Sequence, residues 1–344
     1  MSGVRSKIKK VLQWTLMLAL AAVLLYFAFR GVKWEDFISG VRSCNFAWIL
    51  VSMLASILAF VIRGLRWRLV MLPLNPAITR REAYDGVTIA YLTNFALPRA
   101  GELARCGVIS ATGKTSFESV LGTVVLERSW DMVTYLIILF VVLLAGESSF
   151  GQFVSDEVWQ PAVDSMPFDI LWLIGGIAAL CVGACVLIFC YRKRLSRYKF
   201  FAKLFSLAKG LIGGLTAGLK MRGKWRFLLY TLLLWLCYWI MSYSTILAIP
   251  QVAGLNWVDA LFLMVVGSLG WIVPVQGGIG AYHFILSLAM SSIYSIPRTS
   301  GVIFATISHE SQALTMLLCG AVSLAAMYIS RRKKDRQKSN GYEK

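Results

Sequence analysis

Three charged residues at three-residue spacing follow Pro98 in the middle of an apolar stretch: Arg99, Glu102 and Arg105. A helix that begins after the proline places all three along one face. Guanidinium groups bind phosphate and carboxylate oxygens through paired hydrogen bonds, and a carboxylate beside them can form an ion pair or carry a proton. Each charge would cost roughly 3 kcal/mol or more if it faced lipid. The pattern therefore predicts a polar cavity, lined by protein, that can hold an anion.

A second charged group lies on the next apolar run, at Glu127, Arg128 and Asp131. On a helix Glu127 and Asp131 share a face, and Arg128 is spaced to pair with Asp131. Two interpretations of these charges remain open: they line the same substrate cavity, or they form a salt-bridge network that holds a hairpin against this helix. Asn94, four residues before Pro98, is expected either to cap a helix or to bind the substrate.

Polar groups also gather around a second break, which follows Pro274. The glycines after this proline permit tight turns and allow a ligand to approach the backbone amides. A histidine in a membrane segment is either a packed, hydrogen-bonded residue or a substrate ligand, and both interpretations remain open for His283 and His309. The predicted substrate-binding residues of the whole chain are Asn94, Arg99, Glu102, Arg105, Glu127, Arg128, Asp131, Gln276, Gly277, Gly278, His283 and Glu310.

The composition indicates which elements must position these groups. Of 344 residues, 58% are hydrophobic and 15% are charged, and the mean hydropathy is +0.68. Such a chain is an all-α polytopic membrane protein, because a soluble chain of this length needs more polar surface. The net charge of +18 does not indicate nucleic-acid binding, because the Lys and Arg residues lie mainly between apolar runs and at the ends. This is the positive-inside pattern, and it also favours contact with anionic lipids.

Several kinds of site are absent from the sequence. It contains no CxxC pair, no catalytic triad at recognisable spacing and no metal motif. The seven cysteines are predicted to be apolar packing residues. Gly113-Lys114-Thr115 lacks the upstream glycine and the strand that a phosphate-binding loop requires. We therefore expect no catalytic site, no metal and no cofactor, and the protein is not expected to be an enzyme.

The apolar runs predict about six full spans in a single membrane domain with both termini in the cytoplasm. The first run is too long and bulky for a cleaved signal segment. The polar residues 30–42 are expected to form a loop, and the acidic residues 146–169 an exterior loop. The segment 192–226 contains eleven basic residues and no acidic one, which indicates a cytoplasmic loop with an amphipathic helix lying on anionic lipid. The predicted spans are 11–29, 46–62, 120–145, 170–191, 227–249 and 302–329, followed by a basic cytoplasmic tail at 331–344.

Two further apolar segments are broken into short halves, each too short to cross a bilayer. One is divided at Pro98-x-x-Gly101 and the other at Pro274-x-x-Gly277. We expect two re-entrant helical hairpins that enter from opposite sides, each followed by a long helix. Residues 84–145 and 258–329 would then form an inverted repeat, and paired broken segments of this kind indicate the binding site of a transporter.

The motifs Asn94-x-x-x-Pro98-Arg99-x-Gly101-Glu102, Glu127-Arg128-x-x-Asp131 and Pro274-x-x-Gly277-Gly278-x-Gly280 resemble the membrane domain of the lysylphosphatidylglycerol synthase/flippase family. The resemblance covers about residues 10–330. It implies a membrane domain that moves a phospholipid, with Arg99, Glu102, Glu127, Arg128 and Asp131 at the family's polar motifs. The chain ends at Lys344 without room for the soluble synthase domain, so the resemblance implies a stand-alone translocase that does not transfer amino acids.

These observations favour a translocase for a phospholipid or lipid-linked anion in the bacterial inner membrane. Arg99, Arg105 or Arg128 would meet the headgroup phosphate. Transport would be downhill or ion-coupled, with possible proton carriers at Glu102, Glu127, Asp131 and Glu310. The alternatives are an ion-coupled small-solute transporter, a membrane-bound transferase that acts on a lipid carrier and a non-catalytic partner in cell-envelope assembly. Besides the lipid substrate and anionic lipids, a homo-oligomer is an open possibility, and no nucleic-acid partner is expected.

Overall fold

The computed structural model describes residues 2–144 and 221–342, and all regular structure in this part of the chain is helical. The chain forms two compact units, residues 1–124 with 222–344 and residues 125–221. The predicted span 170–191, the acidic loop 146–169 and most of the basic segment 192–226, including its amphipathic helix, lie outside the described residues.

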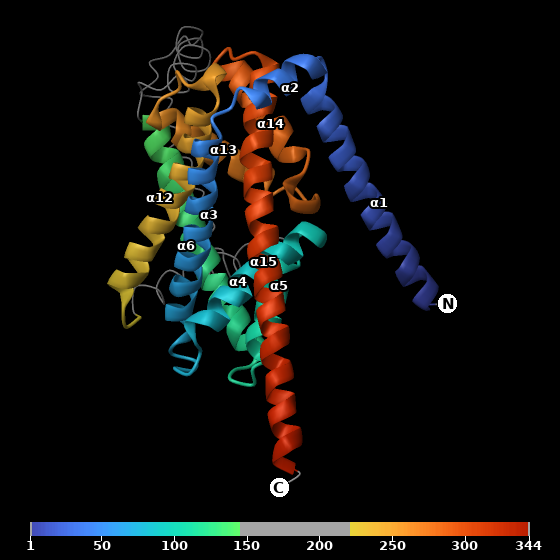
Figure 1. The fold of residues 1–344 in the computed structure, drawn as a ribbon, viewed down its shortest axis with the longest axis vertical. Helices are drawn as coiled ribbons and strands as arrows, with labels where there is room; N and C mark the ends of the chain where they lie inside the picture. The colour runs from blue at the N-terminus through green and yellow to red at the C-terminus, as the bar shows by residue number, and fades with distance from the viewer. Residues whose placement is uncertain (1, 145–220, 343–344) are drawn as a thin grey trace, which may run out of the picture. The chain divides into compact units, whose positions relative to one another are not determined.

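Figure 1 shows the helices in chain order. Their bounds are α1 Ser2–Phe29, α2 Trp34–Arg42, α3 Phe46–Met71, α4 Arg80–Ala96, α5 Gly101–Ser110, α6 Phe117–Leu144, α12 Lys224–Ala248, α13 Trp257–Gly270, α14 Ala281–Ile293 and α15 Arg298–Tyr342, with short 3₁₀ helices η2 Pro250–Val252 and η3 Gln276–Gly278.

Within the described residues, three helices are long and apolar enough to cross a membrane: α3, α12 and the Arg298–Ser330 part of α15. The pair α1 and α2 would make a fourth span, although the two helices meet at an angle of 85°. The 28-residue α6 contains Glu127, Arg128 and Asp131 and is not among them. The described part of the chain is thus all helical and has the long apolar helices of a membrane protein, while the count of six spans stays a prediction.

The segment expected to be a polar loop is a helix in its second half, α2. Gly31, with φ of 83°, ends α1 in the left-handed conformation that glycine adopts without strain. Glu35 and Asp36 then lie in the first turn of α2, where they oppose the positive end of the helix dipole. Trp34 and Phe37 pack against Phe29. The prediction from polarity alone was therefore wrong, because an amphipathic helix carries charges too.

The second predicted span was drawn too short, at residues 46–62. Helix α3 continues to Met71 because no helix breaker occurs before Pro73. Arg63 and Arg66, which lie beyond the predicted end of this span at residue 62, are therefore helical and buried, with exposures of 5% and 0%.

Both broken segments are pairs of short helices, as predicted. Helices α4 and α5 flank Pro98, and α13 and α14 flank the 274–280 turn. Each pair begins with a capping box, Thr79 with Glu82 in the first and Asn256 with Asp259 in the second. Figure 1 shows the first pair toward the end where α15 finishes and the second pair toward the opposite end. Their membrane re-entry and their relation as an inverted repeat stay predictions.

Candidate functional site

Three buried arginines gather around α3, and we call Arg63, Arg66 and Arg105 the arginine cluster. Arg105, on α5, is 2% exposed, and its Cζ lies 4.7 Å from the ring centroid of Trp67. The Trp67 indole in turn donates a 2.9 Å hydrogen bond to Thr123. The first pair of short helices is thereby packed against α3, with a guanidinium group at the contact.

The other two arginines face α12 and α4. Arg63 Nη1 donates to the hydroxyls of Tyr91 at 3.0 Å and Tyr238 at 3.1 Å. Arg66 Nη1 lies 3.4 Å from the Thr231 hydroxyl, and its Cζ is 5.6 Å from the ring centroid of Phe227. Hydroxyls and aromatic rings are thus among the partners of these cations inside the helix bundle, where α4 and α12 each pack on α3.

The first break is built from Asn94 and Arg99. The Asn94 side chain accepts a 2.7 Å hydrogen bond from the backbone N–H of Gly101, across the break. The bond satisfies one N–H of the first turn of α5, whose N-cap residue is Ala100, and the substrate-binding role of Asn94 stays a prediction. Arg99 has φ of 63°, rare for a residue with a side chain. Its Nη2 donates a 2.7 Å hydrogen bond to the carbonyl of Ile272.

The two breaks therefore lie against each other, since Ile272 is four residues before Gln276. Helix α4 also packs on η3, and a Cβ at Gly277 would come within 2.9 Å of the Phe95 ring. Gln276 is half-buried, and neither of its amide atoms, Nε2 and Oε1, has a hydrogen-bond partner among the described residues. Where the two breaks contact each other, the Arg99 guanidinium is exposed and the Gln276 amide has no hydrogen-bond partner among the described residues.

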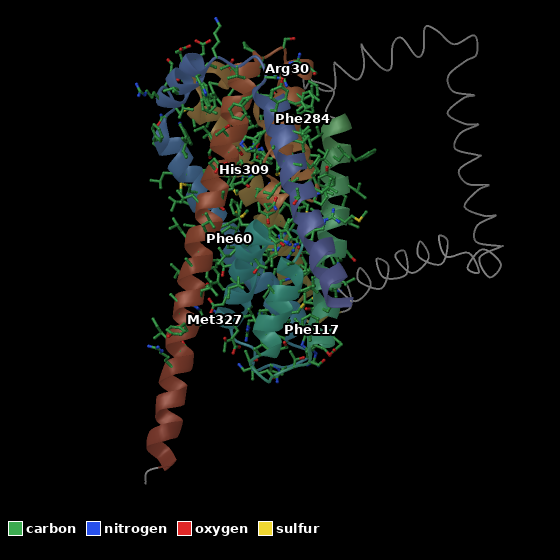
Figure 2. The ribbon with its side chains drawn as sticks, turned by 90° about the vertical axis from the view of Figure 1, so that its right-hand side faces the viewer. Arg30, Phe60, Phe117, Phe284, His309 and Met327 are labelled. Carbon is green, nitrogen blue, oxygen red and sulfur yellow. The ribbon has the colours of Figure 1, made fainter. Side chains whose placement is uncertain are left out.

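The predicted residues His283 and Glu310 form a second polar group with His309. His309 Nδ1 lies 2.9 Å from Glu310 Oε1, and His283 Nε2 lies 3.9 Å from the same oxygen. Both imidazoles are buried, whereas the Glu310 side chain is 58% exposed. Figure 2 shows His309 between the levels of Phe284 and Phe60 along the long axis. Gly277 and Gly278 adopt positive φ, and the Gly277 carbonyl accepts from His309 Nε2 at 2.8 Å.

The remaining predicted residues are distributed over both units. Glu102 lies in the first turn of α5 and is half-buried. In the unit of residues 125–221, Glu127 is fully buried, and Arg128 Nη1 lies 3.8 Å from Asp131 Oδ2. The pairing of Arg128 with Asp131 is as predicted, whereas the convergence of all six charges on one cavity stays a prediction.

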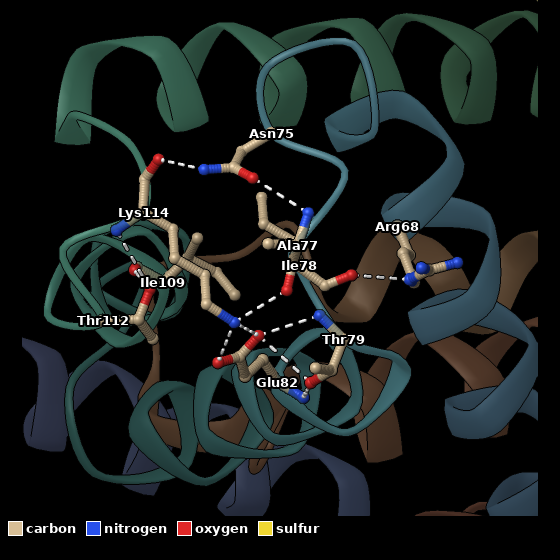
Figure 3. A network of polar contacts seen from close by, with 9 residues as sticks. All are labelled: Arg68, Asn75, Ala77, Ile78, Thr79, Glu82, Ile109, Thr112 and Lys114. Atoms are coloured by element: carbon tan, nitrogen blue, oxygen red, sulfur yellow. Dashed lines mark hydrogen bonds and ion pairs between the residues drawn. The ribbon is translucent and has the colours of Figure 1, made fainter.

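Lys114 has a structural role at the base of the first helix pair (Figure 3). Its Nζ lies 2.8 Å from both Glu82 carboxylate oxygens and 2.7 Å from the Ala77 carbonyl. Asn75 Nδ2 donates to the Lys114 carbonyl at 2.9 Å. Burial alone would raise the pKa of the Glu82 carboxyl, but hydrogen bonds from Lys114 and Thr79 outweigh it and lower the pKa. The lysine thus ties the loop before α4 to the loop after α5.

The sequence analysis missed Arg63 and Arg66 as candidate functional residues. The signal was present: Arg63, Arg66 and Trp67 are spaced to share one helix face, and the first breaker is Pro73. Their aromatic and hydroxyl partners come from α4 and α12, so only the folded structure identifies those contacts.

A comparison with known families gives one match. The family model described as the transmembrane region of lysylphosphatidylglycerol synthase matches residues 14–330. Neither the curated proteins nor the solved structures contain a match to this chain.

Proposed function

This chain belongs to the family defined by the transmembrane region of lysylphosphatidylglycerol synthase, and from that premise we propose that it is a lipid translocase. It moves a phospholipid or a lipid-linked anionic headgroup between the leaflets of the bacterial inner membrane, and it carries out no chemical reaction on the lipid. Family membership supports a lipid-related membrane protein, and the buried arginines supply groups that can bind a headgroup phosphate.

The arginine cluster is the observation that carries this proposal. Three guanidinium groups lie inside one helix bundle, where they are 0–5% exposed. A planar guanidinium donates two parallel hydrogen bonds to a phosphate, and the low dielectric of the bundle strengthens the attraction. Tyr91, Tyr238 and Trp67 hold Arg63 and Arg105 in position before a headgroup arrives. This preorganisation suits a phosphate-bearing substrate better than a neutral solute.

The contact between the two breaks is the part of the protein that we expect to move during transport. Arg99 links the first break to the backbone of the second through one hydrogen bond, and a single exposed bond of this kind is readily exchanged for a bond to water or to an anion. Gln276 adds amide groups that can bind headgroup oxygens. A headgroup that enters here would compete with the Ile272 carbonyl for Arg99 and so separate the breaks.

We further propose that both termini and the α4–α5 pair face the cytoplasm. Arg80, Arg81 and Lys114 lie where this pair begins and ends, and basic residues remain on the cytoplasmic side of bacterial membranes. The segment after Ile329 is positively charged as well, so it would lie on the same side and contact anionic lipid headgroups. Labelling of single cysteines placed at each end with an impermeant maleimide tests this orientation in intact cells.

A transport assay in liposomes tests the function. The purified protein is reconstituted with a fluorescent analogue of phosphatidylglycerol, and lipid movement is followed by dithionite bleaching of the outer leaflet. Arg63→Gln and Arg105→Lys should each reduce the rate about 10- to 100-fold, because a charge-assisted hydrogen bond contributes about 1.5–3 kcal/mol. The lysine variant keeps the charge but loses the planar fork.

Arg42→Gln is the matched control, because Arg42 is an exposed arginine on α2. Thermal unfolding in detergent verifies that each variant is folded. Wild-type rates in both folded cluster variants, or no lipid movement by the wild-type protein, would contradict the proposal.

A further inference from the structure

Both histidines of the chain lie in one small group with Glu310. The chain has two histidines in 344 residues, and they are 26 positions apart, on α14 and α15. One atom from each of His283, His309 and Glu310 can be chosen so that all three lie within 4.8 Å of one another. Two imidazoles and a carboxylate thus lie close enough together to share one ligand.

The contact with a backbone carbonyl determines which ring nitrogen of His309 carries a hydrogen. The Gly277 carbonyl can only accept, so His309 Nε2 carries a hydrogen and donates to it at 2.8 Å. In the neutral imidazole Nδ1 then has a bare lone pair, and this atom faces Glu310 Oε1 at 2.9 Å. Two acceptors at this distance repel each other unless a cation lies between them. That cation is either a proton or a metal ion.

His283 distinguishes the two cations. A proton shared by His309 and Glu310 leaves His283 with no part in the contact, although it is 3% exposed. Its Nδ1 has no hydrogen-bond partner among the described residues, and its Nε2 is 3.9 Å from Glu310 Oε1, too far for a hydrogen bond. A metal ion between the three side chains would use His283 Nε2, which faces the Glu310 carboxylate, as a ligand.

We propose that His283, His309 and Glu310 form a binding site for a divalent transition-metal ion of the zinc class. Two imidazoles and one carboxylate are a ligand set that zinc takes, with a fourth position left for water or an anionic ligand. Ligand atoms in a tetrahedral zinc site are about 3.4 Å apart. The two separations to Glu310 Oε1, 2.9 and 3.9 Å, lie on either side of that value, and the exposed Glu310 side chain can rotate to equalise them. All three ligand atoms lie within 4.8 Å of one another, so binding a metal would also draw the two imidazoles together.

The surroundings of His309 support the same assignment. Metal-binding histidines donate their second N–H to a carbonyl or carboxylate, which fixes the tautomer and the ring. Gly277 supplies that carbonyl from a turn with positive φ, and Trp271 stacks on the His309 ring at 5.3 Å between centroids. Helix α15 carries His309 and Glu310, and α14 carries His283. The second break orients His309 through the Gly277 carbonyl. The metal would join the turn and both helices at one point.

A metal titration tests this site independently of lipid transport. The full chain is purified in detergent with a tag that contains no histidine, treated with chelator and titrated with Zn²⁺ against a chromophoric competitor. We expect one Zn²⁺ per chain, and Co²⁺ should give the visible absorption bands of a four-coordinate site. With histidine labelled by ¹⁵N, the ring-nitrogen signals of both imidazoles should shift on addition of the metal.

Glu310→Gln and His283→Gln should each weaken Zn²⁺ binding at least about 10- to 100-fold, the range seen even for groups that only support a ligand. Glu35→Gln, at an exposed carboxylate on α2, should leave it unchanged. Absence of stoichiometric binding by the folded wild-type chain would overturn the proposal. So would unchanged affinity in both ligand variants, or histidine signals that respond to pH and not to Zn²⁺.

Discussion

The two breaks solve one structural problem with different residues. At the first break a side-chain residue, Arg99, occupies the left-handed region, and a side chain, Asn94, caps the following helix. At the second, Gly277, Gly278 and Gly280 take the positive φ values, and no side chain caps α14. A break made by side chains can present charge, whereas a break made by glycines presents backbone and admits close neighbours. The two are therefore suited to different ligands.

The capping boxes at the starts of α4 and α13 also have similar positions and different partners. Pro98 lies 19 residues after the cap Thr79, and Pro274 lies 18 residues after the cap Asn256. Glu82 of the first capping box also pairs with Lys114, while Asp259 of the second is buried and bonds the backbone of its own cap. The two pairs thus have similar spacing and different partners, and their relation as an inverted repeat stays a prediction.

The largest effect should come from a methyl group at the second break. A Cβ at Gly280 would lie 2.5 Å from the carbonyl of Ala21 in α1 and would add the cost of a φ of +82°. Gly280→Ala should lower the free energy of unfolding by about 2–4 kcal/mol, from overpacking and backbone strain together. Gly101→Ala meets the Ala90 carbonyl but has no such strain, so about 1–3 kcal/mol is expected. Denaturant titration in mixed micelles measures both.

Two other glycines separate the cost of backbone strain from the cost of steric overlap. Gly113 has φ of +73° with no atom near its Cβ position, so Gly113→Ala should cost only the strain, about 1 kcal/mol. Gly254 has neither feature, and its substitution should change stability by less than about 0.5 kcal/mol. Equal losses at Gly280 and Gly113 would show that α1 does not restrict the second break.

The existence of both breaks could be predicted from Pro98 and Pro274, because proline and glycine act on the local backbone. The partners of the breaks could not, since Arg99 meets Ile272 across 173 positions of sequence. The burial of Arg63 was missed for the opposite reason. Its charge led us to end the predicted span at residue 62, yet the guanidinium is interior, where Tyr91 and Tyr238 are among its partners. Local signals thus predicted the helices, and tertiary contacts decided which charges are interior.

The next effect concerns the cap that only the first break has. Asn94→Ala removes the acceptor of the Gly101 N–H and should destabilise the protein by about 1 kcal/mol, as loss of a helix cap does. Asn94→Asp keeps an acceptor oxygen and should recover most of that stability. Thermal unfolding followed by tryptophan fluorescence measures the difference. Equal melting temperatures for the alanine variant and the wild type would mean that the Asn94 amide serves the substrate instead.

Two substitutions of Arg99 distinguish the cost of its backbone strain from the loss of its hydrogen bond at the same break. Arg99→Ala and Arg99→Gly both remove the hydrogen bond to the Ile272 carbonyl. Only glycine relieves the φ of 63°, so the glycine variant should be about 1 kcal/mol more stable than the alanine variant. Lipid transport should fall by the same factor in both, because both lose the guanidinium. Transport that follows stability, with the glycine variant near wild type, would assign Arg99 a purely structural role.

The smallest effect should be at Lys114, which joins the two outer ends of the first helix pair through Glu82. Lys114→Met should destabilise the protein by about 0.5–1 kcal/mol near neutral pH, because the pair with Glu82 is partly exposed. The folded-state pKa of Glu82 is lowered from its ordinary value of 4.5, so the ion pair contributes fully above that pH and is lost as the pH falls through the lowered pKa. The stability difference between wild type and Lys114→Met should therefore shrink below about pH 4.5. A difference that stays constant from pH 7 to about pH 3 would show that the lysine acts through the Ala77 carbonyl alone.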